Sequence, residues 1–300
     1  MIRTLEQMEE KVLMLGKRHR VAVAWAQDPN TINAVNKAVS NGLIEAFLIG
    51  NPDEIRKACI KEEIDFSHFT IIEASGEGNA AQKAVWMARN GEADIVMKGL
   101  VSTDKFLREI LDRENGLMLP DSVLSYVCAV QVPAYDKLLF ITDPAVIPYP
   151  DLDQKLAMAR YAIEMALKFG IEKPKVALIG ASEKMSRHIQ NTVDYAIMCK
   201  MAERGQIKNC IMDGPLDLFL ACDKKSNEIK GVDTPINGEA DILLFPSLES
   251  SNPFYKGMML FANGELAGLI AGTSKPVIVM SRSESEKSKY YCIALSFLMA

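Results

Sequence analysis

The stretch KPVIVMSR, residues 275–282, decides the fold class of this chain. Its apolar run Val277–Met280 has no polar alternation, which is typical of a strand buried on both faces of a parallel sheet. The run stops at Ser281 and Arg282. Because ligands of open α/β sheets collect at the carboxyl ends of strands, we expect these two side chains at a ligand site. A guanidinium there suits a phosphate or a developing oxyanion, while pairing with a surface carboxylate is the structural alternative.

Outward from this stretch, the chain alternates between apolar strand patterns and amphipathic helix patterns, which predicts parallel α/β sheets flanked by helices. Three prolines, Pro144, Pro148 and Pro150, interrupt the alternation and mark a candidate domain boundary. We expect strands at residues 21–26, 45–50, 70–73, 93–99, 122–132, 138–143, 175–180, 210–215 and 240–246.

Length and composition bound the class of protein. A chain of 300 residues indicates two domains or one large one, and we expect two. The content of 49% hydrophobic and 24% charged residues is typical of a globular protein. The net charge of −5 argues against a general binder of nucleic acid or acidic membranes, so a small-molecule partner is expected. No apolar stretch reaches the roughly 18–20 residues of a membrane span, and the charged, helix-like N-terminus is unlike a signal peptide. We therefore expect a cytoplasmic protein. The six cysteines lack metal-binding spacing and are expected to be free thiols.

Polar side chains follow several of the predicted strands. Lys98 and Gly99 close one strand, and Thr103 is expected to cap the helix that follows. Asp143 closes another strand, and Asn252 lies in the loop after a third. Their recurrence on carboxyl-end loops is typical of an α/β enzyme site. A loop glycine followed by an ordinary capped helix is the structural alternative for Gly99 and Thr103.

Common cofactor motifs are missing from the sequence. No GxGxxG follows the first strand, which disfavours a dinucleotide site, and no GxxxxGK[ST] is present. HExxH and GxSxG are also absent, and only three histidines occur, so neither a zinc site nor a serine nucleophile elbow is expected. We expect no bound cofactor or metal.

An ordered set of short motifs resembles the phosphate acetyl/butyryltransferase family, and its butyryltransferase branch most closely. The likeness runs from about residue 20 to the C-terminus and is most specific over residues 200–215. The motifs are MKGLV (97–101) with Thr103, KMAERGQIK (200–208), DGPL (213–216), GEADILL (238–244), Asn252 with Tyr255-Lys256, and Ser281-Arg282.

The resemblance implies a two-domain fold similar to isocitrate and isopropylmalate dehydrogenases, with the active site in the interdomain cleft. Residues 1–142 completed by 270–300 would form the first α/β domain, and residues 143–269 the second. The implied activity is that of an acyltransferase, acyl-CoA plus phosphate giving acyl phosphate plus CoA, in a ternary complex without a covalent intermediate. Coenzyme A would be a substrate, butyryl would be preferred over acetyl, and relatives suggest a homodimer or larger homo-oligomer.

The resemblance also assigns roles to particular residues. Arg282 would hold the phosphate or acyl phosphate, and Ser281 would hydrogen-bond the reacting centre. Phosphate or substrate binding is expected of Lys98, Gly99, Thr103, Ser125, Asp143, Asn252 and Lys256.

Four positions depart from the family pattern. Ser288 stands where the acetyltransferase branch has an aspartate assigned as the base for the CoA thiol, a departure shared by the butyryltransferase branch. Ser247 and Phe219 replace common aspartates, and Ser251 replaces a glycine. These changes leave open a ligand-binding or regulatory relative with weakened catalysis. A decarboxylating dehydrogenase would need metal-binding aspartates and a nicotinamide site, which the sequence does not offer.

Overall fold

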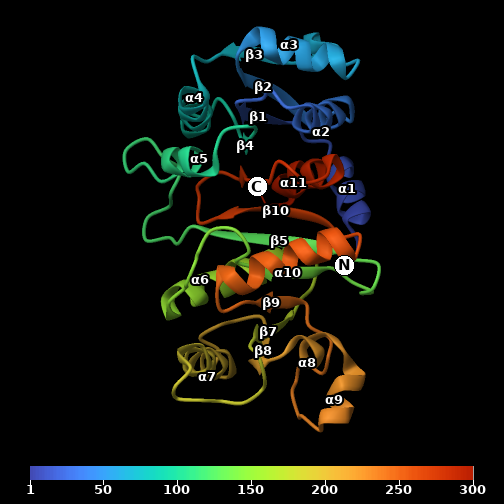
Figure 1. The fold of residues 1–300 in the computed structure, drawn as a ribbon, viewed down its shortest axis with the longest axis vertical. Coiled ribbons are helices and arrows are strands. Elements are labelled where there is room, and N and C mark those ends of the chain that lie inside the picture. The colour runs from blue at the N-terminus through green and yellow to red at the C-terminus, as the bar shows by residue number, and fades with distance from the viewer. Residues whose placement is uncertain (300) are drawn as a thin grey trace. The chain divides into compact units, whose positions relative to one another are not determined.

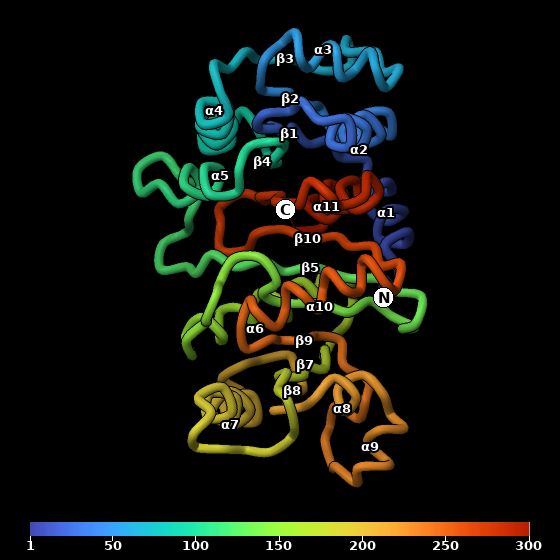
Figure 2. The backbone as a smooth tube through the Cα atoms, viewed as in Figure 1, coloured from blue at the N-terminus to red at the C-terminus, as the bar shows by residue number. Residues whose placement is uncertain are grey.

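The computed structural model describes residues 1–299, and the chain divides into two compact units. Unit 1 comprises residues 1–4 and 125–264, and unit 2 comprises residues 5–124 and the chain from residue 265 onward. Figure 2 shows how unit 2 is completed, because the red segment after residue 265 runs beside the blue and teal segments of residues 5–124.

Unit 2 is built on a mainly parallel sheet with the strand order β3-β2-β1-β4-β11-β10. Strands β1 to β4 and β11 run parallel, whereas β10 is antiparallel to β11. The strands are β1 (His19–Ala24), β2 (Ile44–Gly50), β3 (Thr70–Glu73), β4 (Ile95–Lys98), β10 (Glu265–Ala271) and β11 (Val277–Ile278).

Helices cover both faces of the unit 2 sheet. In Figure 1, α4 and α5 lie on one side of these strands, and α1, α2 and α11 lie on the other. Helix starts follow the capping residues, since Asp28 accepts a hydrogen bond from Thr31 N and Asn51 accepts one from Asp53 N. The helices are α1 (Leu5–Met14), α2 (Pro29–Ser40), α3 (Pro52–Lys61), α4 (Glu77–Arg89), α5 (Thr103–Ile110), α11 (Glu286–Met299) and the 3-10 helix η1 (Phe66–His68).

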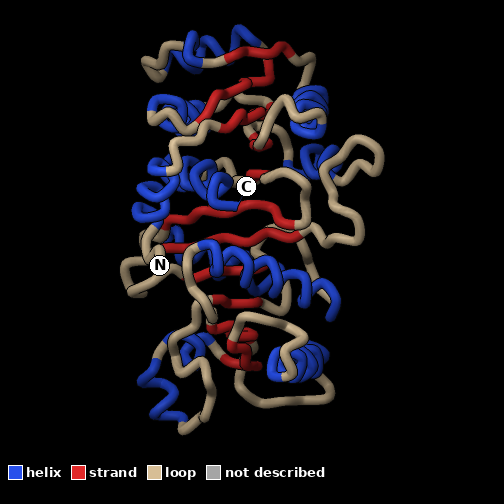
Figure 3. The backbone as a smooth tube through the Cα atoms, turned by 180° about the vertical axis from the view of Figure 1, so that it is seen from behind, coloured by secondary structure: helices blue, strands red, loops and turns tan. Residues whose placement is uncertain are grey.

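The strands of unit 1 follow the order β5-β6-β9-β7-β8. Strand β5 is antiparallel to β6, and the other pairs are parallel. Figure 3 shows helices (blue) on either side of these strands (red), with α7 opposite α8 and α9. The elements are β5 (Ser125–Gln131), β6 (Leu139–Thr142), α6 (Leu152–Lys168), β7 (Lys175–Ile179), α7 (Gln190–Glu203), β8 (Ile211–Leu216), α8 (Leu218–Cys222), α9 (Lys224–Lys230), β9 (Ile242–Leu244) and α10 (Leu248–Phe261).

The strand expected from the KPVIVMSR stretch is confirmed, with one difference. Residues 277–280 are buried and β11 pairs in parallel with β4, as expected. The other neighbour, β10, is antiparallel, because the chain turns back through residues 272–276 directly from β10 into β11. The expected mainly parallel α/β fold is therefore present.

The limits of the two units differ from the domain division expected from the sequence. Residues 125–142 were expected in the first domain, but β6 pairs in parallel with β9, which keeps β5 and β6 in unit 1. The prolines after residue 143 mark the loop between β6 and α6, where the chain stays within unit 1.

All six cysteines are free thiols, three of them buried and three partly exposed. No helix within residues 1–299 is long and apolar enough to cross a membrane.

Candidate active site

Lys98 ends strand β4 and lies beneath the loop that follows it. Its side chain is buried, and Nζ donates to the carbonyl oxygens of Gly99 at 3.0 Å and Val101 at 3.1 Å. An ammonium has three donors, so this loop engages two of them. The third N–H is available to an anion at the carboxyl end of the sheet.

The environment of Lys98 lowers the pKa of its ammonium group. Burial lowers the pKa of Lys98 to about 8, the positive charge of Arg282 adds to this effect, and the carboxylate of Asp28 opposes it. Lys98 is therefore mainly protonated at neutral pH and loses its charge as the pH rises through about 8.

Arg282 connects the end of β11 to the same loop. Its guanidinium is exposed and Nη2 donates to the carbonyl oxygen of Leu100 at 2.9 Å. Ser281 is also exposed, and its Oγ lies 3.0 Å from Ser283 Oγ. Because β4 and β11 are parallel neighbours, their polar ends meet at one edge, which brings Lys98 together with Arg282.

Gly99 is required by close backbone packing between β4 and β1. A Cβ at this position would lie 2.6 Å from the carbonyl oxygen of Trp25 and 2.8 Å from that of Ala24. Gly99 N also donates to Ala24 O at 2.8 Å. The glycine thus lets the end of β4 pack against the end of β1, whatever ligand the edge binds.

Thr103 does not cap α5, so that expectation is wrong. It is the first residue of the helix and is exposed, whereas Ser102 occupies the capping position. The Ser102 side chain makes no cap hydrogen bond, and its backbone N–H donates to Glu77 Oε2 at 3.0 Å.

Glu77 is a charged neighbour of Arg282 that the sequence did not indicate. It opens α4 and accepts hydrogen bonds from Lys105 Nζ and Ser102 N. The hydrogen bond from Lys105 is the main cause that lowers the pKa of Glu77, and Arg282 contributes to the same shift. Glu77 therefore stays ionised beside the guanidinium. Nothing distinguishes it in the sequence from an ordinary first-turn acid.

In unit 1, Asp143 organises the loop that follows β6. Its buried carboxylate accepts hydrogen bonds from Ser125 Oγ at 2.9 Å and Tyr126 N at 3.0 Å on Oδ2. Oδ1 accepts from Ala145 N and Val146 N, both at 2.8 Å. Burial raises the pKa of Asp143, and these four hydrogen bonds oppose that change. Ser125 and Asp143 are thus brought together and hold the turn.

The start of α10 is fixed to this same loop. Ser251 is buried, and its Oγ donates to the carbonyl oxygen of Asp143 at 2.6 Å. Asn252 Nδ2 donates to the carbonyl oxygen of Pro144 at 2.8 Å. Lys256 is exposed one turn further along the helix. The serine that departs from the family glycine therefore ties α10 to the loop.

Chemically, the unit 2 edge offers a guanidinium, a buried ammonium and a hydroxyl at the ends of adjacent strands. Such a set suits a phosphate or another small oxyanion. Across residues 1–299, no three His, Cys, Asp or Glu side chains are grouped so as to hold a metal ion.

Comparisons with known proteins agree with this chemistry. The family model described as Phosphate acetyl/butaryl transferase matches residues 77–297. Phosphate butyryltransferase of Clostridium acetobutylicum is 40% identical over 281 residues, which is 94% of this chain and 93% of that protein. Phosphate acetyltransferase of Thermotoga maritima is 35% identical over 296 residues, 99% of each chain.

A solved structure gives the same result at the level of the fold. The crystal structure of a branched-chain phosphotransacylase from Enterococcus faecalis V583 matches with a TM-score of 0.81 at 28% identity, covering 93% of this chain and 99% of that one. The resemblance seen in the sequence motifs is confirmed. The chain therefore belongs to the phosphate acetyl/butaryl transferase family.

Proposed function

We propose that this protein is a phosphate acyltransferase that converts acyl-CoA and phosphate into acyl phosphate and CoA. The main observation in support is that Lys98 and Arg282 lie close together at the carboxyl ends of the paired strands β4 and β11. Two positive groups at one strand edge are what an enzyme needs to hold an inorganic anion for attack. The names of the relatives supply the acyl-CoA substrate.

In the proposed reaction, a phosphate oxygen attacks the thioester carbonyl carbon. The carbon–sulfur bond then breaks, and the proton of the phosphate reaches the departing thiolate by way of the acid–base group assigned below, so that CoA leaves as the thiol. Arg282 holds the phosphate through its planar fork, and Lys98 supplies a second charge. The hydroxyl of Ser281 donates to the carbonyl oxygen as negative charge develops there.

Direct transfer in a ternary complex is preferred to an acyl-enzyme route. Cys292 is the cysteine closest in sequence to Arg282, and it is fully buried. Burial raises the pKa of the Cys292 thiol to about 12, so little thiolate forms at neutral pH. A direct route gives intersecting initial-rate patterns when acyl-CoA and phosphate are varied, whereas a covalent route gives parallel ones.

For the reverse reaction, we assign the base that accepts the CoA thiol proton to Glu265. Ser288 is buried, and its Oγ donates to Glu265 Oε2 at 2.5 Å. Ser285 Oγ donates to the same oxygen at 2.7 Å. Glu265 thus places a carboxylate, held by two hydroxyls, against the turn that follows Arg282. Because both directions pass through the same transition state, a Glu265→Gln variant should lose kcat/KM by the same factor in both directions, and near-normal turnover would contradict a base role.

The finer features follow from the family. We propose a fold like that of isocitrate and isopropylmalate dehydrogenases, a site in an interdomain cleft, a homodimer or larger assembly, and butyryl preferred over acetyl. The higher identity to the butyryltransferase than to the acetyltransferase supports the acyl preference. Relative rates with acetyl-, butyryl- and isobutyryl-CoA test it, and acetyl-CoA turning over fastest would contradict it.

A further inference from the structure

Unit 1 contains a cavity that lies away from the loop of Asp143. Its volume is about 590 Å³, within the range of small-molecule sites. Leu138, Lys175 and Asp241 line it and stand at or just before the first residues of β6, β7 and β9. Asp143 follows the last residue of β6, so the cavity and that loop lie at opposite ends of the same strand.

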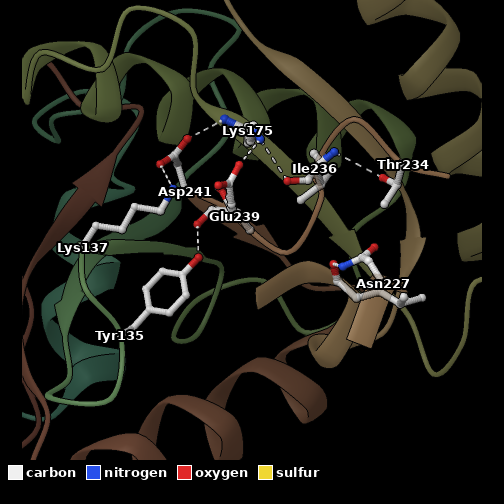
Figure 4. A network of polar contacts seen from close by, with 10 residues as sticks. Tyr135, Lys137, Lys175, Asn227, Thr234, Ile236, Glu239 and Asp241 are labelled. Atoms are coloured by element: carbon white, nitrogen blue, oxygen red, sulfur yellow. Dashed lines mark hydrogen bonds and ion pairs between the residues drawn. The ribbon is translucent and has the colours of Figure 1, made fainter. Parts of the chain in front are cut away.

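A chain of ion pairs forms one wall of this cavity (Figure 4). Asp241 Oδ1 accepts a hydrogen bond from Lys137 Nζ at 2.5 Å, and its Oδ2 accepts one from Lys175 N at 2.8 Å. Lys175 Nζ lies 2.7 Å from Glu239 Oε2. These contacts join the starts of β6, β7 and β9. Holding these strands together is enough to explain them.

The two lysines keep donor capacity beyond these contacts. Lys137 Nζ donates to Asp241 Oδ1 and to the carbonyl oxygen of Glu239 at 2.8 Å. Lys175 Nζ donates to Glu239 Oε2 and to the carbonyl oxygen of Ile236 at 3.1 Å. An ammonium has three N–H donors, so each lysine has one left for a ligand oxygen.

Positive charge exceeds negative charge around the cavity. Five basic side chains line it, Arg3, Lys137, Lys173, Lys175 and Lys224, against three acidic ones, Asp136, Glu239 and Asp241. Lys173 and Lys224 are exposed and form no ion pair with any described residue. They lie outside the wall of ion pairs, so holding the strands together does not explain them.

The remaining lining is partly apolar. Ile2, Leu138, Ile171 and Cys222 contribute to it, and Tyr135 adds a ring whose hydroxyl donates to the carbonyl oxygen of Ala240 at 2.9 Å. We propose that this cavity binds a small organic polyanion that carries two or more carboxylate or phosphate groups. Its charged groups meet Lys173, Lys224 and the free donors of the wall, and its carbon skeleton meets the apolar side.

Titration calorimetry with citrate, at constant ionic strength, tests this site. The expected result is one bound anion per chain, with affinity reduced roughly tenfold in the double variant Lys173→Ala/Lys224→Ala, because two charged donors are removed. Neither lysine has a part in the proposed transfer, so acyl transfer should be unchanged in this variant. Lys225→Ala is the matched control, since Lys225 is exposed on the same helix as Lys224 but does not line the cavity.

Thiol labelling locates the bound anion. Cys222 lines the cavity, so an anion bound there should slow modification of Cys222 while leaving Cys199 and Cys210 unchanged. Absence of binding, or equal affinity in the double variant and the parent chain, would overturn the proposal. Binding without protection of Cys222 would place the anion elsewhere, which would also overturn it.

Discussion

Replacing Arg282 by alanine separates catalysis from stability. The side chain is exposed and its one described hydrogen bond goes to the carbonyl oxygen of Leu100. Loss of an exposed contact of this kind costs under about 1 kcal/mol of the free energy of unfolding. Loss of a positioned donor to a reacting oxyanion costs about 10²–10³-fold in rate, or roughly 3–4 kcal/mol of transition-state stabilisation. Arg282→Ala should therefore be nearly inactive and normally folded.

The assay measures kcat/KM for phosphate by release of the CoA thiol, together with urea unfolding of the same preparations. Arg282→Lys keeps the charge but loses the planar fork, so its rate should lie between those of the parent and the alanine variant. Arg108→Ala, at an exposed arginine in the last turn of α5, is the matched control and should retain activity. Near-normal turnover of Arg282→Ala would refute the reasoning, and so would unfolding that accounts for its lost activity.

Three further predictions follow from particular contacts. Burial lowers the pKa of Lys98 to about 8, and only protonated Lys98 is expected to bind phosphate. The KM for phosphate should therefore rise as the pH increases through about 8, and this rise should vanish in Lys98→Ala. A rise that persists in that variant would contradict the role of Lys98. Lys155 and Asp194 form a buried ion pair at 2.6 Å. Asp194→Ala should therefore lower the free energy of unfolding, measured by urea denaturation, by about 3–5 kcal/mol. A loss below about 1 kcal/mol would contradict this stabilising role of the pair. Gly99→Ala should cost about 1–3 kcal/mol because the added Cβ would lie 2.6 Å from Trp25 O, whereas unchanged stability would show that the ends of β1 and β4 can separate.

The sequence predicted the fold well where single segments carry the signal. Unbroken apolar runs identified the buried strands, and the polar residues after them identified Lys98 and Arg282 as edge residues. It could not show that these two residues meet, because the parallel pairing of β4 with β11 joins segments far apart in the chain. The sequence also could not show that β6 pairs with β9. Because of this pairing, the long segment of unit 1 begins at residue 125.

Other features depend on contacts that residue type alone does not reveal. Ser125, Asp143 and Asn252 were expected to bind substrate, and the structure shows each of them holding the loop after β6. Their part in binding stays a prediction. The sequence did not indicate the cavity of unit 1, because its lysines lie before a strand, open a strand or begin a short helix, where a solvated surface charge is the ordinary interpretation.

One measurement tests the central claim most directly. The purified protein is incubated with butyryl-CoA, with and without phosphate, and both the free CoA thiol and the acyl phosphate, trapped with hydroxylamine, are quantified. Phosphate acyl transfer predicts that both products form in equal amounts and only when phosphate is present. A folded protein that releases no CoA, or that releases CoA without acyl phosphate and independently of phosphate, would contradict it.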